Sequence, residues 1–253
     1  MKTIIPLCIF TLLSTLPLTF AETICVAHRG NNAEFLENSS AAIISAAEMD
    51  APGIEFDVQH TKDGVPIIMH DKTLKRTTLD NGTCPRSKEI KSLTFTEIKR
   101  NCLLKDNAPI PSLDETLNYL TTSSSHPYIE LKDHPNVNTI EILKKHYLEK
   151  PEDLVIISFK SSYLSWVNNK RKDYPFLKQV TLIWVNKKSK NSIASYLNGI
   201  DVKKLKKRHF KALKKKALIV GVWTKNSEKS INYYKDLGVD FITTNHIRRC
   251  LTL

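Results

Sequence analysis

Short runs of apolar and β-branched residues recur along the chain, and stretches with helical periodicity separate most of them. The pattern predicts eight strands, at 24–27, 54–58, 66–70, 127–131, 154–159, 180–185, 218–223 and 240–243. Helices are predicted to begin near Ser39, Thr94, Ser112, Asn136, Ser161, Ser192, Val202 and Ser227. The alternation indicates a parallel sheet, and its length and number of repeats favour a closed (β/α)8 TIM barrel over an open sheet.

The second and third predicted strands lie too close together for a helix to connect them. Asp63-Gly64 between them is a strong signal for a hairpin turn, and a two-residue turn there would place Asp57 opposite His70. A compressed crossover without a helix is the alternative. Residues 71–111 contain no convincing strand, so we expect an irregular insertion after the third strand, over one face of the barrel.

The start of the chain has the pattern of a targeting segment. Lys2 precedes an apolar stretch from Ile4 to Phe20, and Ala21 stands at a cleavage position. A membrane anchor is the alternative, but prolines interrupt the stretch, which is barely long enough to span a bilayer. We therefore expect a signal peptide at 1–21, export to the periplasm or the medium, and one large domain at 22–253.

The cysteines that follow the predicted signal peptide are Cys25, Cys84, Cys102 and Cys250. An oxidising destination permits disulfides, and Cys84 and Cys102 are the plausible pair because both lie in the insertion. Cys25 lies inside the first predicted strand, where we expect it to be only a small buried apolar residue. None has the Cys-x-x-Cys spacing that is typical of zinc or redox sites.

The chain is basic, with a formal net charge of +12, and nine of the fourteen residues at 203–216 are Lys or Arg. Apolar residues recur there at helical spacing, which predicts an amphipathic helix with a basic outer face. A solvated helix is the simplest interpretation, and peripheral contact with an anionic membrane surface is the alternative. Nucleic-acid binding is not expected, because zinc-finger spacing is absent and no aromatic residues alternate with the basic ones.

Polar residues gather where the first four predicted strands end, which is where barrel enzymes place their working groups. These positions are His28-Arg29-Gly30, Glu55-x-Asp57, His70-Asp71 and Glu130-x-Lys132. Residues two apart on a strand share a face. If the apolar neighbours of Glu55 and Asp57 face the helices, both carboxylates must therefore face the barrel interior.

Three inward carboxylates, those of Glu55, Asp57 and Glu130, are too costly to bury without positive partners. Pairing with Arg29 and Lys132 alone would leave the charge unbalanced. A hard divalent cation with oxygen ligands removes this cost, so we expect Mg2+ or Ca2+ rather than zinc.

His28 and His70 lie at two of these strand ends, beside the carboxylates. Imidazoles titrate near neutral pH, and phosphodiester cleavage needs one group to accept a proton and another to donate one. Together with a metal and Arg29 for the phosphoryl oxygens, these residues favour a phosphodiesterase.

The motifs together resemble the glycerophosphodiester phosphodiesterase family, within the phosphatidylinositol-phospholipase-C-like barrels. The matching segments extend over almost the whole mature chain. In order they are His28-Arg29-Gly30, Glu37-Asn38-Ser39, Glu55-Phe56-Asp57-Val58, Thr61-x-Asp63-Gly64, His70-Asp71, Arg76-Thr77-Thr78, Ile110-Pro111-x-Leu113-x-Glu115, Ile129-Glu130-Leu131-Lys132, Val222-Trp223-Thr224 and Gly238-Val239-Asp240.

The resemblance implies metal-dependent hydrolysis of glycerophosphodiesters to glycerol 3-phosphate and an alcohol. It implies that the acid/base pair is His28 and His70, and that the ligands of one divalent cation are Glu55, Asp57 and Glu130. It also implies that Arg29 and Lys132 bind the phosphate and that Trp223 lines the glycerol pocket. Glu37 would support the site.

Two departures from the family pattern stand near the end of the chain, at Asn245, where an Asp is frequent, and at Lys225, where a hydrophobic residue is frequent. We expect them to affect substrate preference rather than the chemistry. Two other functions stay open. One is a phospholipase D-like or lysophospholipid-cleaving enzyme on the same barrel. The other is a non-catalytic binding protein. This function is disfavoured because every catalytic and metal position of the family pattern is occupied by the expected residue.

Overall fold

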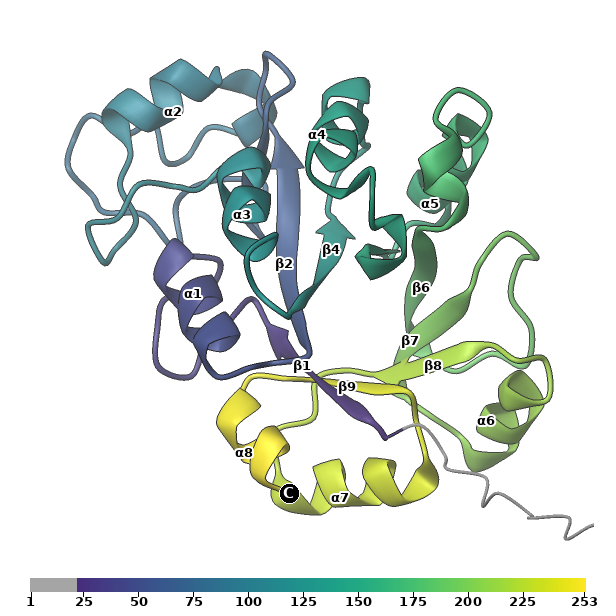
Figure 1. The fold of residues 1–253 in the computed structure, drawn as a ribbon. Helices are drawn as coiled ribbons and strands as arrows, with labels where there is room; N and C mark the ends of the chain where they lie inside the picture. The colour runs from purple at the N-terminus through teal and green to yellow at the C-terminus, as the bar shows by residue number, and fades with distance from the viewer. Residues whose placement is uncertain (1–21) are drawn as a thin grey trace, which may run out of the picture.

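The computed structural model describes residues 22–253, so the predicted signal peptide at 1–21 lies outside the described residues. Eight parallel strands form the barrel (Figure 1). They are β1 (Ile24–His28), β2 (Gly53–His60), β4 (His126–Leu131), β5 (Val155–Ser158), β6 (Thr181–Lys188), β7 (Gly199–Lys204), β8 (Ile219–Val222) and β9 (Phe241–Thr244). Because β1 pairs with both β2 and β9, the sheet closes, which confirms the predicted TIM barrel.

Helices cover the outside of the barrel (Figure 1). They are α1 (Ser40–Glu48), α3 (Leu113–Leu120), α4 (Val137–Tyr147), α5 (Ser161–Lys170), α6 (Lys207–Lys214), α7 (Glu228–Leu237) and α8 (Ile247–Thr252). The apolar residues Ile54, Phe56 and Val58 of β2 are buried in the layer between the strands and the helices. The alternating residues Glu55 and Asp57 therefore face the barrel interior, as predicted.

The third predicted strand is not a barrel strand. β3 (Pro66–Ile68) pairs antiparallel with β2 and forms a hairpin, so the hairpin prediction is confirmed. Its register is one residue away from the predicted one: the backbone N–H of Met69, not of His70, donates to the carbonyl of Asp57. The difference arises at the turn, where Gly64 adopts a left-handed conformation (φ 77°) and the loop has three residues instead of two.

The strand that takes the place of β3 in the count of eight barrel strands is β7, and the sequence analysis missed it. The helices predicted near Ser192 and Val202 are wrong: residues 189–198 connect β6 to β7 without a helix, and Val202 lies in β7. The basic helix is correspondingly shorter than 203–216, because α6 begins only at Lys207. Ile200 and Val202 are buried against the helices while Asp201 faces the interior, which is the alternation of a strand.

The predicted insertion lies between the β2–β3 hairpin and α3, and it has a small apolar core of its own around Leu74, Ile90 and Ile98. A 3₁₀ turn (Ile90–Ser92) and α2 (Phe95–Asn101) are its only regular elements within residues 71–111. The Cys84–Cys102 disulfide is present, which confirms that prediction.

Cys25 is not simply a buried apolar residue, because it forms a disulfide with Cys250. This bond ties β1 to α8, a helix that the sequence analysis did not predict. Both disulfides fit the oxidising destination expected for an exported protein. Among the described residues, no helix has the length and apolar character that crossing a membrane requires.

The two disulfides are expected to contribute unequally to stability. Cys25–Cys250 spans 225 residues and Cys84–Cys102 spans 18, so the first restricts the unfolded chain more. Chain-entropy arguments give about 5 and about 3 kcal/mol. Double replacement by alanine should then lower the melting temperature by about 10–15 °C for the first pair and about 5–10 °C for the second. Calorimetry of both double variants tests this, and equal shifts would contradict it.

Candidate active site

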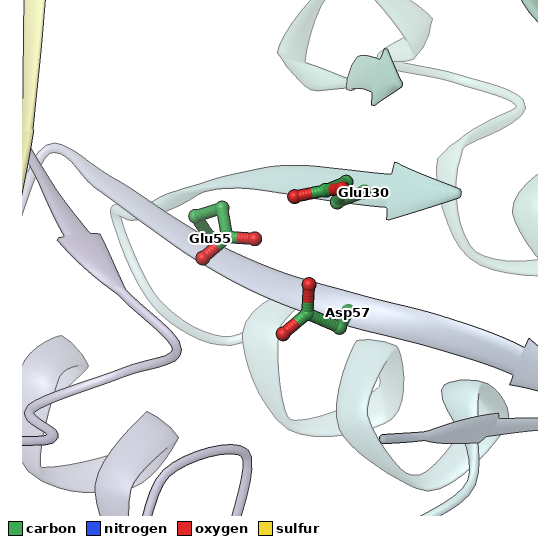
Figure 2. A group of neighbouring side chains, drawn as sticks. All are labelled: Glu55, Asp57 and Glu130. Atoms are coloured by element: carbon green, nitrogen blue, oxygen red, sulfur yellow. The ribbon is translucent and has the colours of Figure 1, made fainter. Parts of the chain in front are cut away.

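Three carboxylates converge at the carboxyl ends of neighbouring barrel strands. Glu55 and Asp57 project from β2, and Glu130 projects from β4, where the strand register places it beside Asp57. Each residue offers an oxygen atom, and these oxygens lie within 4.8 Å of one another. Figure 2 shows the three side chains directed into one shared space. All three are buried, so the structure brings together the ligand set that the sequence predicted.

Burial makes this cluster electrostatically costly. Burial, together with repulsion from Asp57 and Glu130, raises the pKa of Glu55 well above its ordinary value. Burial and Asp57 raise the pKa of Glu130 to about 7, although Lys132 opposes this. For Asp57 burial acts in the same direction, but attraction to Arg29 and Lys132 outweighs it and lowers the pKa of that carboxyl.

Glu55 Oε1 is buried without a hydrogen-bond partner among the described residues, and Asp57 Oδ1 has only the ion pair with Lys132 Nζ, 3.5 Å away. A buried acceptor without a hydrogen bond is rare in proteins, because it loses its hydration. A hard divalent cation accepts carboxylate oxygens as ligands. The donor set and these two oxygens therefore fit a single Mg2+ or Ca2+ ion.

Arg29 follows β1 and reaches across the cluster. Its backbone N–H donates to Glu55 Oε2 (2.9 Å), and its Nε lies 3.1 Å from Asp57 Oδ2. The next residue must be glycine, because Gly30 has φ 76° and a Cβ there would lie 2.5 Å from the backbone of Ala42 in α1. This close approach holds the Arg29 loop against the helix.

Asn38 is a site residue to which the sequence analysis gave no role. Its Nδ2 donates to Asp57 Oδ2 (2.8 Å), and its Oδ1 accepts from the backbone N–H of Asp57 (3.1 Å). Asn38 is itself buried and has a left-handed backbone (φ 59°). The only sequence signal for it was its place in the Glu37-Asn38-Ser39 motif. It orients the Asp57 carboxylate.

His28 ends β1, His70 follows β3 by two residues, and both line one cavity. His28 Nδ1 lies 2.6 Å from Asn245 Oδ1, and His70 Nδ1 lies 2.7 Å from Asp71 Oδ1. Because amide and carboxylate oxygens accept, each Nδ1 donates, and in the neutral ring each Nε2 keeps its lone pair. Both imidazoles thus have the same tautomer.

Burial, followed by the nearby positive charge of Arg29, lowers the pKa of His28 to about 4. His28 is therefore neutral near pH 7. Its partner Asn245 is one of the two departures that the sequence analysis assigned to substrate preference. The hydrogen bond to His28 corrects that view, since it places this departure on the candidate acid/base pair. Asn226 supports it by accepting from the Asn245 backbone N–H.

A chain of ion pairs leads from His70 to Arg29. Asp71, which contacts His70, accepts from Arg76, and Arg76 also donates to both carboxylate oxygens of Glu37. Glu37 accepts in turn from Arg29. The Arg76 contact, above all, lowers the pKa of Asp71 to about 2. Glu37 therefore supports the site as expected, by linking Arg29 to Arg76. Arg76 is a further residue of this ion-pair chain, and the sequence analysis had given it no role.

The cavity at the carboxyl ends of the strands has a volume of about 360 Å³, enough for a small molecule. Its lining includes the polar residues His28, Arg29, Glu55, His70, Glu130 and Lys132. Lys132 donates to Glu130 (2.8 Å) and lies 3.5 Å from Asp57. A larger hollow of about 590 Å³ lies along α4, but none of the predicted site residues lines it.

The lining of the cavity also has apolar members, and Trp223 is among them, as predicted. The Trp223 ring meets Phe159 edge to face, with centroids 5.1 Å apart. Asp201 lines the same cavity and is buried, and burial followed by the charge of Glu130 raises its pKa well above the ordinary value. The sequence analysis missed Asp201 because it missed β7. Carboxylates of the cluster and apolar side chains thus line one cavity.

Comparison with known proteins gives an independent line of evidence. A model of the Glycerophosphoryl diester phosphodiesterase family matches residues 28–249. Glycerophosphodiester phosphodiesterase 1 of Homo sapiens is 28% identical over 271 residues, which cover 89% of this chain and 78% of the relative. Glycerophosphodiester phosphodiesterase of Bacillus subtilis is 28% identical over 250 residues, with 87% and 83% covered.

Solved structures show the same fold. A phosphodiesterase of Oleispira antarctica, in complex with the product sn-glycerol-3-phosphate, aligns with a TM-score of 0.75 and 20% identity, covering 91% of this chain and 96% of that one. A glycerophosphodiester phosphodiesterase of Agrobacterium tumefaciens aligns with a TM-score of 0.75 and 24% identity, covering 91% and 100%.

Proposed function

The chain belongs to the glycerophosphoryl diester phosphodiesterase family, and from that membership we propose that it hydrolyses glycerophosphodiesters to glycerol 3-phosphate and an alcohol. The observation that carries the proposal is a buried three-carboxylate cluster at a cavity that two imidazoles also line, each imidazole with its Nδ1 held by an oxygen acceptor. Burying three carboxylates costs stability, so folding alone does not account for this arrangement.

Glu55, Asp57 and Glu130 would hold one divalent cation, Mg2+ or Ca2+, through carboxylate oxygens. When bound, such a cation withdraws charge from phosphoryl oxygens and offsets the negative charge of its ligands. Asn38 and Arg29 keep Asp57 oriented and ionised for this role.

His28 is suited to act as the base. It is neutral near pH 7, and its Nδ1–H is fixed on Asn245, so its Nε2 lone pair is free to take a proton from the nucleophile. The nucleophile is either water, which gives glycerol 3-phosphate directly, or a substrate hydroxyl, which gives a cyclic phosphate that water then opens. His70 is suited to act as the acid, because Asp71 holds its Nδ1–H and directs its Nε2 away from that contact. In its doubly protonated form His70 would then give the Nε2 proton to the leaving alcohol oxygen and keep the Nδ1 proton on Asp71.

Arg29 and Lys132 line the cavity beside the carboxylates and would bind the phosphate oxygens. The edge-to-face pair of Trp223 and Phe159 would contact the carbon skeleton of the glycerol or of the alcohol. We expect the phosphate to lie beside the two imidazoles and the organic groups to contact the apolar lining residues.

A substrate panel tests the proposal. Purified protein supplied with Mg2+ or Ca2+ should release glycerol 3-phosphate from glycerophosphocholine, glycerophosphoethanolamine or glycerophosphoglycerol. Cleavage of lysophosphatidylcholine alone would replace the proposal with the lysophospholipid-cleaving alternative. Failure to cleave any diester, with either cation, would leave the barrel as a non-catalytic binding protein.

A further inference from the structure

The rim of the barrel beside the cavity carries many positive charges and almost no negative ones. Six lysines lie at the ends of β6 and β7 and at the start of α6, all exposed to solvent, and we call them the rim lysines: Lys187, Lys188, Lys203, Lys204, Lys206 and Lys207. None forms an ion pair with another described residue of the chain. Across residues 186–216 the single acidic residue is Asp201, and it is buried.

The strand register places this charge directly beside the cavity mouth. Val185 and Asp201 line the cavity and lie opposite each other on β6 and β7, and three residues later Lys188 lies opposite Lys204. The strands therefore carry the lysines about 10 Å beyond the cavity wall. Lys203 shares the inward face with Asp201, and its Nζ lies 5.8 Å from the Trp223 ring centre.

The rim charge is unfavourable for the isolated molecule. α6 begins with Lys207 and Arg208 and has no acidic residue in its first turn, and Lys206 provides no side-chain cap. Cations at a helix N-terminus oppose the helix dipole, and neighbouring lysines repel one another. The rim is also held in place, since Ser189 at the end of β6 bonds to His209 of α6 (2.8 Å). A set of lysines without acidic partners on an anchored backbone indicates an external anionic partner.

We propose that this rim docks the cavity mouth onto an anionic lipid bilayer. Phe159 lines the cavity and is 37% exposed; its ring meets that of Trp223 edge to face, and it is suited to the headgroup layer. A nucleic acid fits less well, because the aromatic side chains of residues 186–216, Tyr196 and Phe210, are half-buried and offer no fully exposed ring on which bases could stack. The contact surface thus includes the ends of β6 and β7, and not only the basic helix.

Vesicle sedimentation tests the docking. The purified protein should bind vesicles that contain phosphatidylglycerol, should not bind pure phosphatidylcholine vesicles, and should bind less tightly as salt is added. The double variant Lys188→Gln/Lys204→Gln should bind on the order of 30-fold more weakly, since each surface lysine contributes about fivefold near an anionic membrane.

The matched control is Lys215→Gln/Lys216→Gln, which removes the same charge beyond the last turn of α6, about 12 Å from the rim. Lys214 there pairs with Asp240, just before β9, at the opposite end of the barrel. The control should keep its affinity. Equal losses in both variants, no binding to anionic vesicles, or tighter binding to DNA than to vesicles would each overturn the proposal.

Turnover of soluble glycerophosphocholine separates this inference from the proposed function. Lys188 and Lys204 lie on the outward faces of their strands, so their double variant should retain turnover while it loses vesicle binding. Vesicle binding without any turnover by the unaltered protein would count against hydrolysis and leave the docking surface standing.

Discussion

Replacement of His28 or His70 by alanine is expected to lower kcat for glycerophosphocholine by about 1,000-fold, because each variant loses one of the two proton-transfer groups. Both side chains lie in the cavity rather than in the apolar core, so the fold should persist. Steady-state kinetics with circular dichroism measures both effects. A near-normal kcat for either variant would remove that histidine from the mechanism.

The matched control for these variants is His126→Ala. His126 begins β4, at the end of the barrel opposite the cavity, and is half-exposed. Its replacement should leave kcat unchanged. If the histidine variants lost activity only because the barrel was disturbed, this control would lose activity as well.

The leaving group distinguishes the acid from the base. A diester with a p-nitrophenyl leaving group needs little protonation as it departs, so it should restore much of the activity of His70→Ala. The same substrate should restore far less for His28→Ala, since the nucleophile still lacks its base. Restoration of the His28 variant in place of the His70 variant would reverse the two assignments.

Removal of divalent cations is the second change with a large expected effect. A chelator should lower turnover by about 1,000-fold or more, and Mg2+ or Ca2+ should restore it. At about 100 times its Kd, the cation should also stabilise the fold by about 2.7 kcal/mol and raise the melting temperature by about 5–10 °C. The thermal shift reports binding independently of catalysis.

Variants of the carboxylates test whether the cation binds at the predicted cluster. Asp57→Asn and Glu55→Gln should abolish the cation-dependent thermal shift, because each removes a ligand oxygen from the cluster. Asp201→Asn is the control, since Asp201 is also a buried carboxylate of the cavity but does not belong to the cluster. A thermal shift that survives Asp57→Asn and disappears in Asp201→Asn would place the cation elsewhere.

The carboxylate cluster could be predicted because a strand alternates its faces. Once Ile54, Phe56 and Val58 were assigned to the helix side, Glu55 and Asp57 had to face inward. The same rule failed at β7, where Val202 and Leu205 happened to fit helical spacing, and Asp201 was lost with the strand.

The contacts that orient the site were beyond the reach of sequence patterns. Asn38 bonds to Asp57 from 19 positions away, and Asn245 bonds to His28 from 217 positions away. Such partners are set by how loops pack against one another, for which no periodicity exists. The turn at Gly64 shows the same limit locally, since one extra loop residue shifted the whole hairpin register.

The Cys25–Cys250 bond makes the chain a covalent ring from near its first described residue to near its last. A protease that cuts once in any loop between those two positions leaves both fragments joined. The bond also lies three residues from His28 and five from Asn245, where the first strand meets the last. If the protein is exported as expected, such a nick would leave its two ends joined, together with the pairing of β1 and β9 beside His28.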